Sequence, residues 1–179
     1  KPPARDRPRL LFVGSDRPQK RGHLLVDLLS RLPEVDLEFV GPFGPAFPRL
    51  FSSMEGRVAF RGVRSGDDLA QAYATADLLV HPAVGEAFGL VPFEAALAGT
   101  AAVVAGGHGC GEWYGRAGGC VVPPDDVGAL ADAVRSRLRD RHLAGQEALQ
   151  VAEFTRTHLT WAAAAKAFES AYRELLKRS

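Results

Sequence analysis

Residues 78–96 read Leu78-Leu-Val-His-Pro-Ala-Val-Gly-Glu-Ala-Phe-Gly-Leu-Val-Pro-Phe-Glu-Ala-Ala96. The first four are an apolar run of the length of a short buried strand. Gly89 permits close approach of the backbone, and Pro92 suits the first turn of a helix. The segment therefore predicts a strand, a loop and a helix whose N-terminus points into the space beyond the strand.

Similar apolar runs recur along the chain, separated by helix-like stretches. Buried parallel strands consist of continuous apolar residues because helices cover both faces of the sheet. The alternation predicts an α/β fold, a doubly wound, Rossmann-like parallel sheet of six strands. The expected strands are Leu10–Val13, Val35–Val40, Val58–Phe60, Leu78–His81, Ala101–Val104 and Gly119–Val122.

Two stretches near the C-terminus carry apolar residues at helical spacing. Such stripes are typical of helices that pack on a core, and we expect core packing rather than cofactor contacts for both. The first stripe comprises Val127, Leu130, Ala131, Val134 and Leu138, and the second comprises Trp161, Ala164, Ala165, Phe168, Tyr172 and Leu175.

The composition is that of an ordinary globular protein. Of 179 residues, 46% are hydrophobic and 24% charged, which argues against disorder. A net charge of +1 lacks the excess of cations typical of nucleic-acid-binding domains. No apolar run approaches the ~18 residues that span a bilayer. We therefore expect no nucleic-acid partner, no transmembrane segment and a cytoplasmic location, with Cys110 and Cys120 reduced.

The proline-rich residues 1–8 are predicted to form a linker, and residues 9–179 a single domain. This start is typical of a domain cut from a larger protein. The bias of 18 Arg against 4 Lys favours a bacterial source with a GC-rich coding sequence. A proline-rich loop carries Phe43, Phe47 and Phe51, and it is either a contact surface for another domain or a loop that packs its own side chains.

The loop after the first strand concentrates cations. Arg17, Lys20 and Arg21 lie between Gly14 and Gly22, in a turn that leads into a helix. Backbone amides and the helix dipole attract anions at such a position, so a diphosphate clamp and a solvated basic loop are both open interpretations. The loop is neither a dinucleotide fingerprint nor a P-loop, which argues against a Rossmann dehydrogenase.

Two carboxylates follow the fourth strand, where open parallel sheets bind their ligands. Glu86 precedes the predicted helix and Glu94 lies one turn inside it. Carboxylates accept hydrogen bonds from paired hydroxyls well. They also occur as surface ion pairs or beside helix dipoles, but the apolar residues around this pair favour a functional role.

The segment from Glu86 to Glu94 resembles the E-x7-E signature of the family 4 retaining glycosyltransferases, which have the GT-B fold. Further landmarks are similar to the family in the same order, and they cover nearly the whole chain. They are Phe12-Val-Gly-Ser-Asp16 with Lys20-Arg21-Gly22, Phe60-Arg61-Gly62, Ala76-Asp77-Leu-Leu-Val-His-Pro82, Ala98-Gly-Thr100, Gly109-Cys-Gly-Glu112 and Gly118-Gly-Cys-Val-Val-Pro-Pro124.

The resemblance implies the C-terminal, donor-binding half of a GT-B enzyme that transfers a sugar from a nucleotide-diphosphate sugar. Lys20 and Arg21 would neutralise the donor diphosphate, with Arg17 as a further candidate. Glu86 would contact hydroxyls of the transferred sugar, and Glu94 those of the ribose. The sequence departs from the family at Ala101, where the family has proline. The spacing from Gly14 to Gly22 is also one residue longer than in the family, and this difference leaves the choice of the phosphate-binding cation open.

The resemblance also implies contacts made by two loops. Phe88, Gly89, Leu90 and Val91 would surround the phosphates, with backbone amides as donors. Arg61, Gly62 and Val63 would lie against the base. His108 and Glu112 lie near a further helix start, where loop flexibility and helix capping explain them as well as a contact with the sugar.

We expect no metal and no cofactor besides the donor substrate. The chain has no Asp-x-Asp element, and helix capping explains its adjacent acidic pairs, Asp67-Asp68 and Asp125-Asp126. The histidines at positions 23, 81, 142 and 158 lack the spacing of a metal cluster.

A second interpretation is a catalytically inactive GT-B-like module for nucleotide binding or domain association, against which the Glu86/Glu94 pair argues. In the family, the N-terminal half binds the acceptor. That half is the expected partner of this chain, any peripheral membrane contact would be made through it, and the chain alone is expected to transfer little or no sugar.

Overall fold

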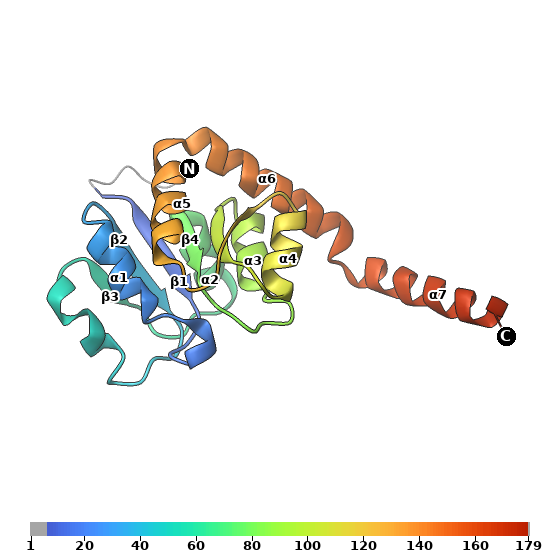
Figure 1. Ribbon diagram of the computed structural model, residues 1–179, viewed down its shortest axis with the longest axis horizontal. Helices are drawn as coiled ribbons and strands as arrows, with labels where there is room; N and C mark the ends of the chain where they lie inside the picture. The colour runs from blue at the N-terminus through green and yellow to red at the C-terminus, as the bar shows by residue number, and fades with distance from the viewer. Residues whose placement is uncertain (1–6, 179) are drawn as a thin grey trace.

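The computed structural model describes residues 7–178 and contains one six-stranded, all-parallel sheet (Figure 1). Its strand order is β3-β2-β1-β4-β5-β6. The strands β2 and β3 are added on one side of β1, and β4 to β6 on the other, so the strand order reverses between β1 and β4. The six predicted strands are confirmed to within one residue at each end. They are β1 (Arg9–Val13), β2 (Asp36–Val40), β3 (Val58–Phe60), β4 (Leu78–His81), β5 (Ala102–Ala105) and β6 (Cys120–Val122).

Helices cover both faces of this sheet, as the continuous apolar strands require. The α1 and α5 helices pack together on one face, and α2, α3 and α4 cover the other, where α6 lies along α3 (Figure 1). The helices are α1 (Leu24–Arg31), α2 (Gly66–Thr75), α3 (Val91–Leu97), α4 (Gly109–Arg116), α5 (Val127–Arg139), α6 (Arg141–His158) and α7 (Trp161–Arg178), with short 3₁₀ turns at η1 (Pro18–Lys20) and η2 (Pro48–Met54).

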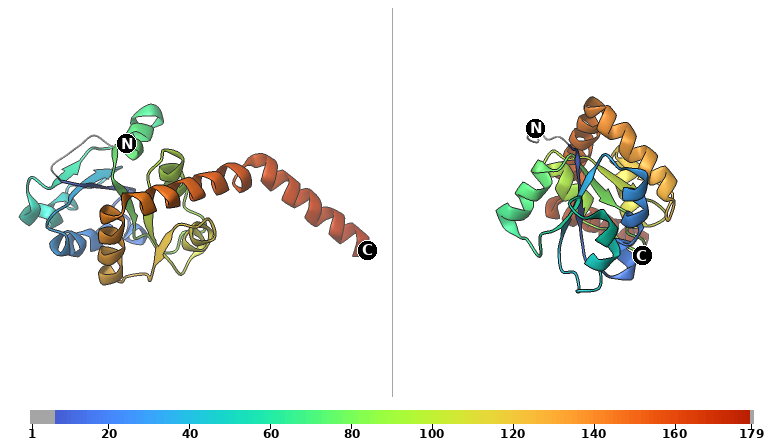
Figure 2. Two further views of the ribbon diagram at one scale, coloured as in Figure 1. Left: turned by 90° about the horizontal axis from the view of Figure 1, so that it is seen from above. Right: turned by 90° about the vertical axis from the view of Figure 1, so that its left-hand side faces the viewer.

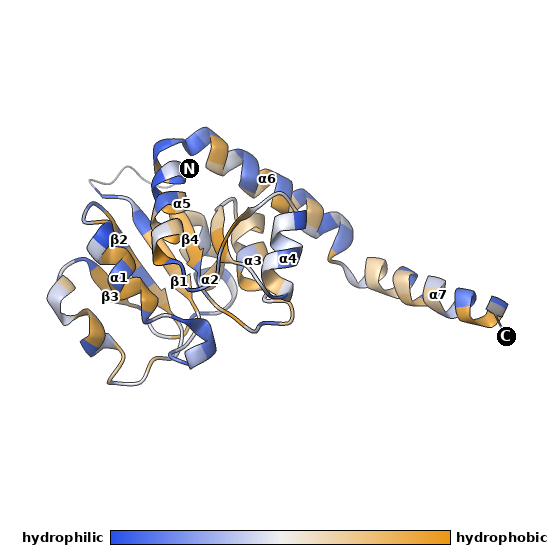
Figure 3. Ribbon diagram, viewed as in Figure 1, coloured by the Kyte–Doolittle hydropathy of each residue, from blue (hydrophilic) through white to orange (hydrophobic). Residues whose placement is uncertain are grey.

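Alternate residues of each strand enter one of two apolar cores. On β1, Leu10 and Phe12 join the core under α1 and α5, whereas Leu11 joins the core under α2 and α3. In Figure 3 the strands and the inner helix faces are hydrophobic. Full burial stabilises each such side chain by ~1.5–3 kcal/mol, and the predicted stripe on α5 is part of this core.

The phenylalanine loop after β2 packs its own side chains. The rings of Phe43 and Phe47 stack with centroids 5.0 Å apart, and Phe51 lies 4.9 Å from Phe39 of β2. Phe47 and Phe51 are buried. Of the two interpretations of this loop, the structure shows the second.

The acidic pairs are only partly helix caps. Asp126 caps α5, since its carboxylate accepts a hydrogen bond from the Ala129 amide at 2.8 Å. Asp125 pairs instead with Arg21, which corrects its assignment as a cap. Asp67 and Asp68 lie in the first turn of α2 and do not occupy its N-cap position, which is Ser65. Their negative charge still suits the helix N-terminus.

The predicted core role of the second stripe is wrong. The α7 helix projects away from the sheet (Figures 1 and 2), and Trp161 is 93% exposed. Three further stripe residues, Phe168, Tyr172 and Leu175, are also exposed. The helical period of the stripe predicted an amphipathic helix correctly, but periodicity does not tell whether another part of the same chain covers the apolar face.

The first strand, β1, begins at Arg9, next to the expected linker. Residues 1–6 of the expected linker lie outside the described residues. Arg7 forms an ion pair with Asp36, and the Pro8 carbonyl accepts a hydrogen bond from the Asp36 amide at 2.9 Å. Within residues 7–178, no helix is both long and apolar enough to cross a bilayer.

Candidate functional site

Three glycines hold the loops after β1, β2 and β3 close together. Gly41 has φ +138°, and a Cβ there would lie 1.7 Å from the Gly14 carbonyl oxygen. The Gly41 amide donates to the Gly62 carbonyl at 2.8 Å, and the Gly14 amide donates to the Val40 carbonyl at 3.0 Å. The carboxyl edge of this half of the sheet is therefore built by close backbone approach.

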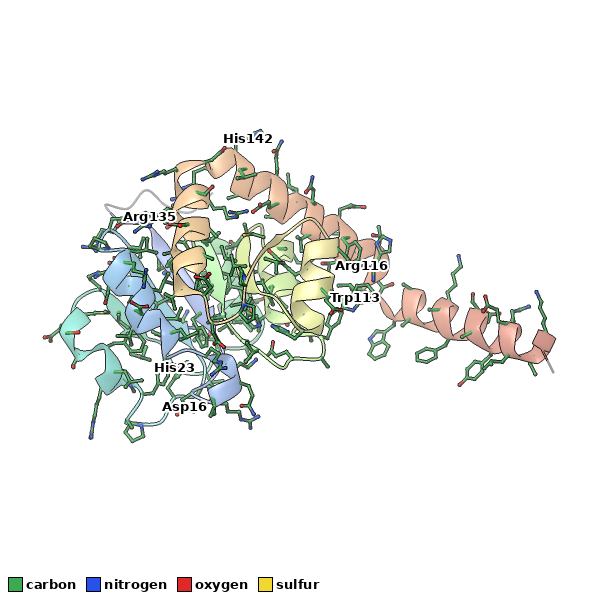
Figure 4. The ribbon with its side chains drawn as sticks, in the orientation of Figure 1. Asp16, His23, Trp113, Arg116, Arg135 and His142 are labelled. Atoms are coloured by element: carbon green, nitrogen blue, oxygen red, sulfur yellow. The ribbon has the colours of Figure 1, made fainter. Side chains whose placement is uncertain are left out.

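The loops after β1 and β4 meet at the point where the strand order reverses. The Val84 amide donates a hydrogen bond to the Gln19 carbonyl at 2.8 Å. This contact sets the end of η1, with Lys20, beside the loop that carries Glu86. Asp16 and His23 belong to the same segment between β1 and α1, and Figure 4 shows both on the lower side of the domain.

Glu86 is held between two nitrogen donors. Lys20 Nζ bonds to Oε1, and His81 Nε2 lies 2.8 Å from Oε2. The Glu86 side chain is 15% exposed, so the carboxylate lies at the surface of the site rather than deep in the core. The structure thus brings together Lys20 and Glu86, which were predicted as separate site residues, and each carboxylate oxygen has one partner.

The pKa values of this cluster fix its protonation state. Hydrogen bonds, first from His81 and then from Lys20, lower the pKa of Glu86 to about 2. Burial lowers the pKa of His81, which is 1% exposed, and the neighbouring Glu86 carboxylate only partly opposes this effect. At neutral pH an ionised carboxylate faces a neutral imidazole. Since that carboxylate only accepts hydrogen bonds, the proton of His81 belongs on Nε2.

The first turn of α4 packs directly on the Glu86 loop. A Cβ at Gly109 would lie 1.9 Å from the Ala87 carbonyl oxygen. The Cys110 amide and His108 Nδ1 both reach the Glu86 carbonyl, at 3.4 and 3.2 Å. His108 therefore supports the backbone of the predicted site residue.

Gly89 leaves space for the Glu86 carboxylate. Its φ is +72°, and a Cβ at this position would lie 2.5 Å from Glu86 Oε2 and 2.8 Å from Cys110 Sγ. Glycine is thus needed here both for its backbone conformation and for the close approach of two side chains.

Glu94 lies in the first turn of α3, half-buried, as expected. Its Oε2 accepts a hydrogen bond from the Tyr73 hydroxyl of α2 at 2.7 Å. Sequence reasoning missed Tyr73, because only the packing of α2 on α3 brings the two side chains together. It also missed His81, although the position of His81 at the end of a buried strand, before the loop with Glu86, was a usable signal.

Residues 7–140 match the sequence family described as "Glycosyl transferases group 1". The chain belongs to this family. It is 34% identical over 127 residues to sulfoquinovosyl transferase of Arabidopsis thaliana (69% of this chain, 22% of the relative). It is 32% identical over 182 residues to D-inositol 3-phosphate glycosyltransferase of Corynebacterium efficiens (91% and 42%).

Among solved structures, the sucrose-phosphate synthase of Thermosynechococcus elongatus matches this chain with a TM-score of 0.83 and 29% identity. The match covers 97% of this chain and 47% of the synthase. The Rossmann-like sheet is thus of the kind found in GT-B glycosyltransferases. The chain spans less than half the length of each of these three relatives. Family membership sets aside the alternative of a Rossmann dehydrogenase.

Several other predicted site residues contact groups outside the Glu86 cluster. Arg21, with φ +53°, pairs with Asp125 at 3.1 Å, and Arg61 pairs with Glu38 of β2 at 3.2 Å. Arg17 is exposed at the start of η1. Gly62 and Val63 follow β3 in an exposed loop, Leu90 is the exposed N-cap of α3, Val91 is its first residue, and the Phe88 ring stacks on Phe93 with centroids 5.2 Å apart.

Three side chains that can ligate a metal also lie close together at this site. Ligand atoms of His81, Glu86 and Cys110 lie within 4.8 Å of one another, a grouping that histidine spacing did not reveal. Burial and then the charge of Glu86 raise the pKa of Cys110 to about 12, so its thiol is protonated. Lys20 already neutralises the carboxylate. A metal ion at this position would have to displace the thiol proton and the Lys20 ammonium group, which disfavours it, whereas the neutral imidazole would only have to carry its proton on Nδ1.

Proposed function

We propose that this chain is the donor-binding domain of a retaining glycosyltransferase, with a nucleotide-diphosphate sugar as donor. The observation that carries the proposal is the Glu86 cluster. An ionised carboxylate and a lysine meet at the reversal of the strand order, with Glu94 one turn into the helix that follows. Ligands of open α/β sheets bind in the crevice at this point.

Lys20 is the cation best placed for the diphosphate. Its ammonium group carries three N–H donors, so it can keep its bond to Glu86 and still bind a phosphate oxygen. Arg17 and Arg21 lie in the same loop and add positive charge, since the Arg21–Asp125 pair is partly exposed and weak. Backbone amides of residues 89–91 supply further donors to the phosphates in this proposal.

Glu86 and Glu94 bind opposite ends of the donor. Glu86 accepts hydrogen bonds from hydroxyls of the transferred sugar, and Glu94 from those of the ribose. Arg61, Gly62 and Val63 lie along the base. The neutral His81 keeps Glu86 ionised and oriented, which favours an acceptor role over proton donation.

In the transfer step, the bond from the anomeric carbon to the diphosphate oxygen breaks. A bond from that carbon to the acceptor hydroxyl oxygen forms on the same face of the sugar, and the hydroxyl proton passes to the departing diphosphate. Lys20 stabilises the charge that develops on the leaving group, and preorganised donors of this kind contribute ~3–4 kcal/mol in well-studied enzymes. No metal is required in this scheme.

The acceptor is bound by a further domain in this proposal. The chain spans less than half the length of the three relatives named above, and the Lys20–Glu86 pair, where the loops after β1 and β4 meet, supports a role in donor binding. We therefore expect the chain alone to bind nucleotide and to transfer little or no sugar, and we place the enzyme in the cytoplasm, where nucleotide sugars are available.

Calorimetric titration with UDP, GDP, ADP and NAD, each with and without magnesium, tests the proposal. We expect one nucleoside diphosphate to bind, with an affinity that magnesium does not change, and NAD not to bind. A lack of binding by all three diphosphates would favour the inactive module instead, and binding only with magnesium would overturn the metal-independent scheme.

A further inference from the structure

The Tyr73 hydroxyl is the polar contact that the structure adds to Glu94. It donates to Oε2 at 2.7 Å, from α2 to the first turn of α3. Tyr73 is 2% exposed, whereas Glu94 is half-buried. One oxygen of the carboxylate is thus tied to a buried residue, while the Glu94 side chain as a whole stays partly exposed.

Tyr73 itself has little freedom to move. Its ring packs in the core under α2 and α3, together with Leu79 and Phe93. Its carbonyl accepts a hydrogen bond from the buried Thr100 hydroxyl at 2.7 Å, which ties α2 to the end of α3. The hydroxyl therefore holds the carboxylate in place rather than following it.

The chemistry of the pair gives each partner one role. Burial, and then the bond to Glu94, raise the pKa of Tyr73, so the phenol keeps its proton and donates. Within residues 7–178, no lysine or arginine forms an ion pair with Glu94. A carboxylate has about four lone-pair sites, and the phenol occupies one of them, on Oε2. Oε1 is left to accept from a ligand.

We infer that Tyr73 is a positioning residue, which fixes Glu94 so that its remaining acceptor sites match the two vicinal hydroxyls of a ribose. The site thereby selects ribonucleoside over deoxyribonucleoside diphosphates. This inference rests on the proposed donor-binding function and deepens it. A deoxyribose lacks one of these hydroxyls. The Glu94 carboxylate, which the protein holds in place, would then lose one of its hydrogen bonds to the ligand, and the ligand would bind more weakly.

The test compares the chain with its Tyr73→Phe variant in calorimetric titrations. The ligands are UDP, GDP and ADP, each beside its 2′,3′-dideoxy counterpart. For the diphosphate that binds, we expect Tyr73→Phe to weaken binding of the ribose form about three- to tenfold. Binding of the dideoxy form should not change, because that ligand does not use the oriented carboxylate.

Tyr114→Phe is the matched control, since it removes another buried tyrosine hydroxyl, one that accepts from the Ala102 amide at 3.0 Å. We expect it to lower the midpoint of thermal unfolding and to leave the ratio of ribose to dideoxy affinity unchanged. In the Glu94→Gln background, Tyr73→Phe should weaken ribose binding much less than in the parent chain. This second comparison separates positioning of the carboxylate from a general loss of packing.

Three results would overturn the inference. The same affinity ratio in the parent and Tyr73→Phe, with ribose binding intact, would remove the role of Tyr73 alone. Equal binding of ribose and dideoxy forms by the parent would remove the role of Glu94 on the diol. Failure of all three ribose diphosphates to bind the parent would overturn the proposed function and, with it, this inference.

Discussion

Glu86 makes the stability of the fold sensitive to acid. Its pKa lies at about 2 in the folded chain, against an ordinary value of 4.5. A carboxyl group with a lowered pKa stabilises the fold fully above pH 4.5, and this contribution is lost as the pH falls from 4.5 toward 2. The pKa of His81 is also lowered, from 6.5. Below pH 6.5 the unfolded chain therefore binds a proton at His81 more readily than the folded chain does, which further lowers the stability of the fold.

We therefore expect the stability difference between the chain and Glu86→Gln to be largest near neutral pH and to shrink between pH 4.5 and 2. Urea unfolding at a series of pH values measures it. Asp132→Asn, at an exposed carboxylate on α5, is the control and should show a small difference throughout. A difference for Glu86→Gln that is independent of pH would contradict the assigned role of its charge.

The two glutamates are expected to differ in what they bind. Glu94→Ala should weaken binding of the nucleoside diphosphate and of the nucleotide sugar alike, because the ribose is common to both. Glu86→Ala should weaken only the nucleotide sugar. Each lost hydrogen bond to a charged acceptor corresponds to ~1.5–3 kcal/mol, or roughly 10- to 100-fold in affinity. Calorimetry with both ligands decides, and equal losses for both variants would sink this division of roles.

At the scale of elements, the loop of residues 82–90 owes its shape to Gly89. Alanine there would be strained at φ +72°, and its Cβ would displace either Cys110 or the carboxylate oxygen that His81 holds. We expect Gly89→Ala to lower the free energy of unfolding by roughly 2–4 kcal/mol and to weaken nucleotide binding. Chemical denaturation and calorimetry measure the two effects.

Gly85→Ala is a matched control in the same loop. Gly85 has nearly the same backbone conformation, φ +71°, but a Cβ there would meet nothing within 4 Å. Gly85→Ala should lower the free energy of unfolding only by the backbone strain, ~1–2 kcal/mol, and should leave nucleotide binding intact. If both variants lost binding equally, backbone conformation alone would explain the need for glycine, and the close approach of Gly89 to Glu86 would have no separate role.

The sequence predicted the elements and the contents of the loops better than the contacts between elements. Each strand is recognisable in the sequence as an apolar run. Lys20, Glu86 and Glu94 follow such runs, in the segments after β1 and β4. Lys20 and Glu86 meet because the carboxyl ends of the parallel strands β1 and β4 lie side by side. The bond from Tyr73 to Glu94 depends on the packing of two helices, and no local pattern encodes it.

At the scale of the whole molecule, α7 stands apart from the core. The α6 helix ends at His158 on the body of the domain, and α7 extends beyond it with its aromatic residues exposed (Figure 2). An amphipathic helix whose apolar stripe is exposed buries little apolar surface against the sheet and contributes little to its stability. The prediction that this stripe is part of the core was wrong because the burial of a helix face depends on how the whole chain packs, which the local sequence pattern does not determine.

Removal of residues 161–179 should therefore leave the folded domain intact. We expect the midpoint of thermal unfolding to change by less than about 2 °C, since few apolar contacts are lost, and nucleotide binding to be unchanged. Calorimetric scans of the chain and the truncated form measure this. Leu130→Ala, in the buried stripe of α5, should by contrast cost ~2–5 kcal/mol. If truncation lowered the midpoint of thermal unfolding as much as Leu130→Ala does, α7 would have to pack on the domain in solution.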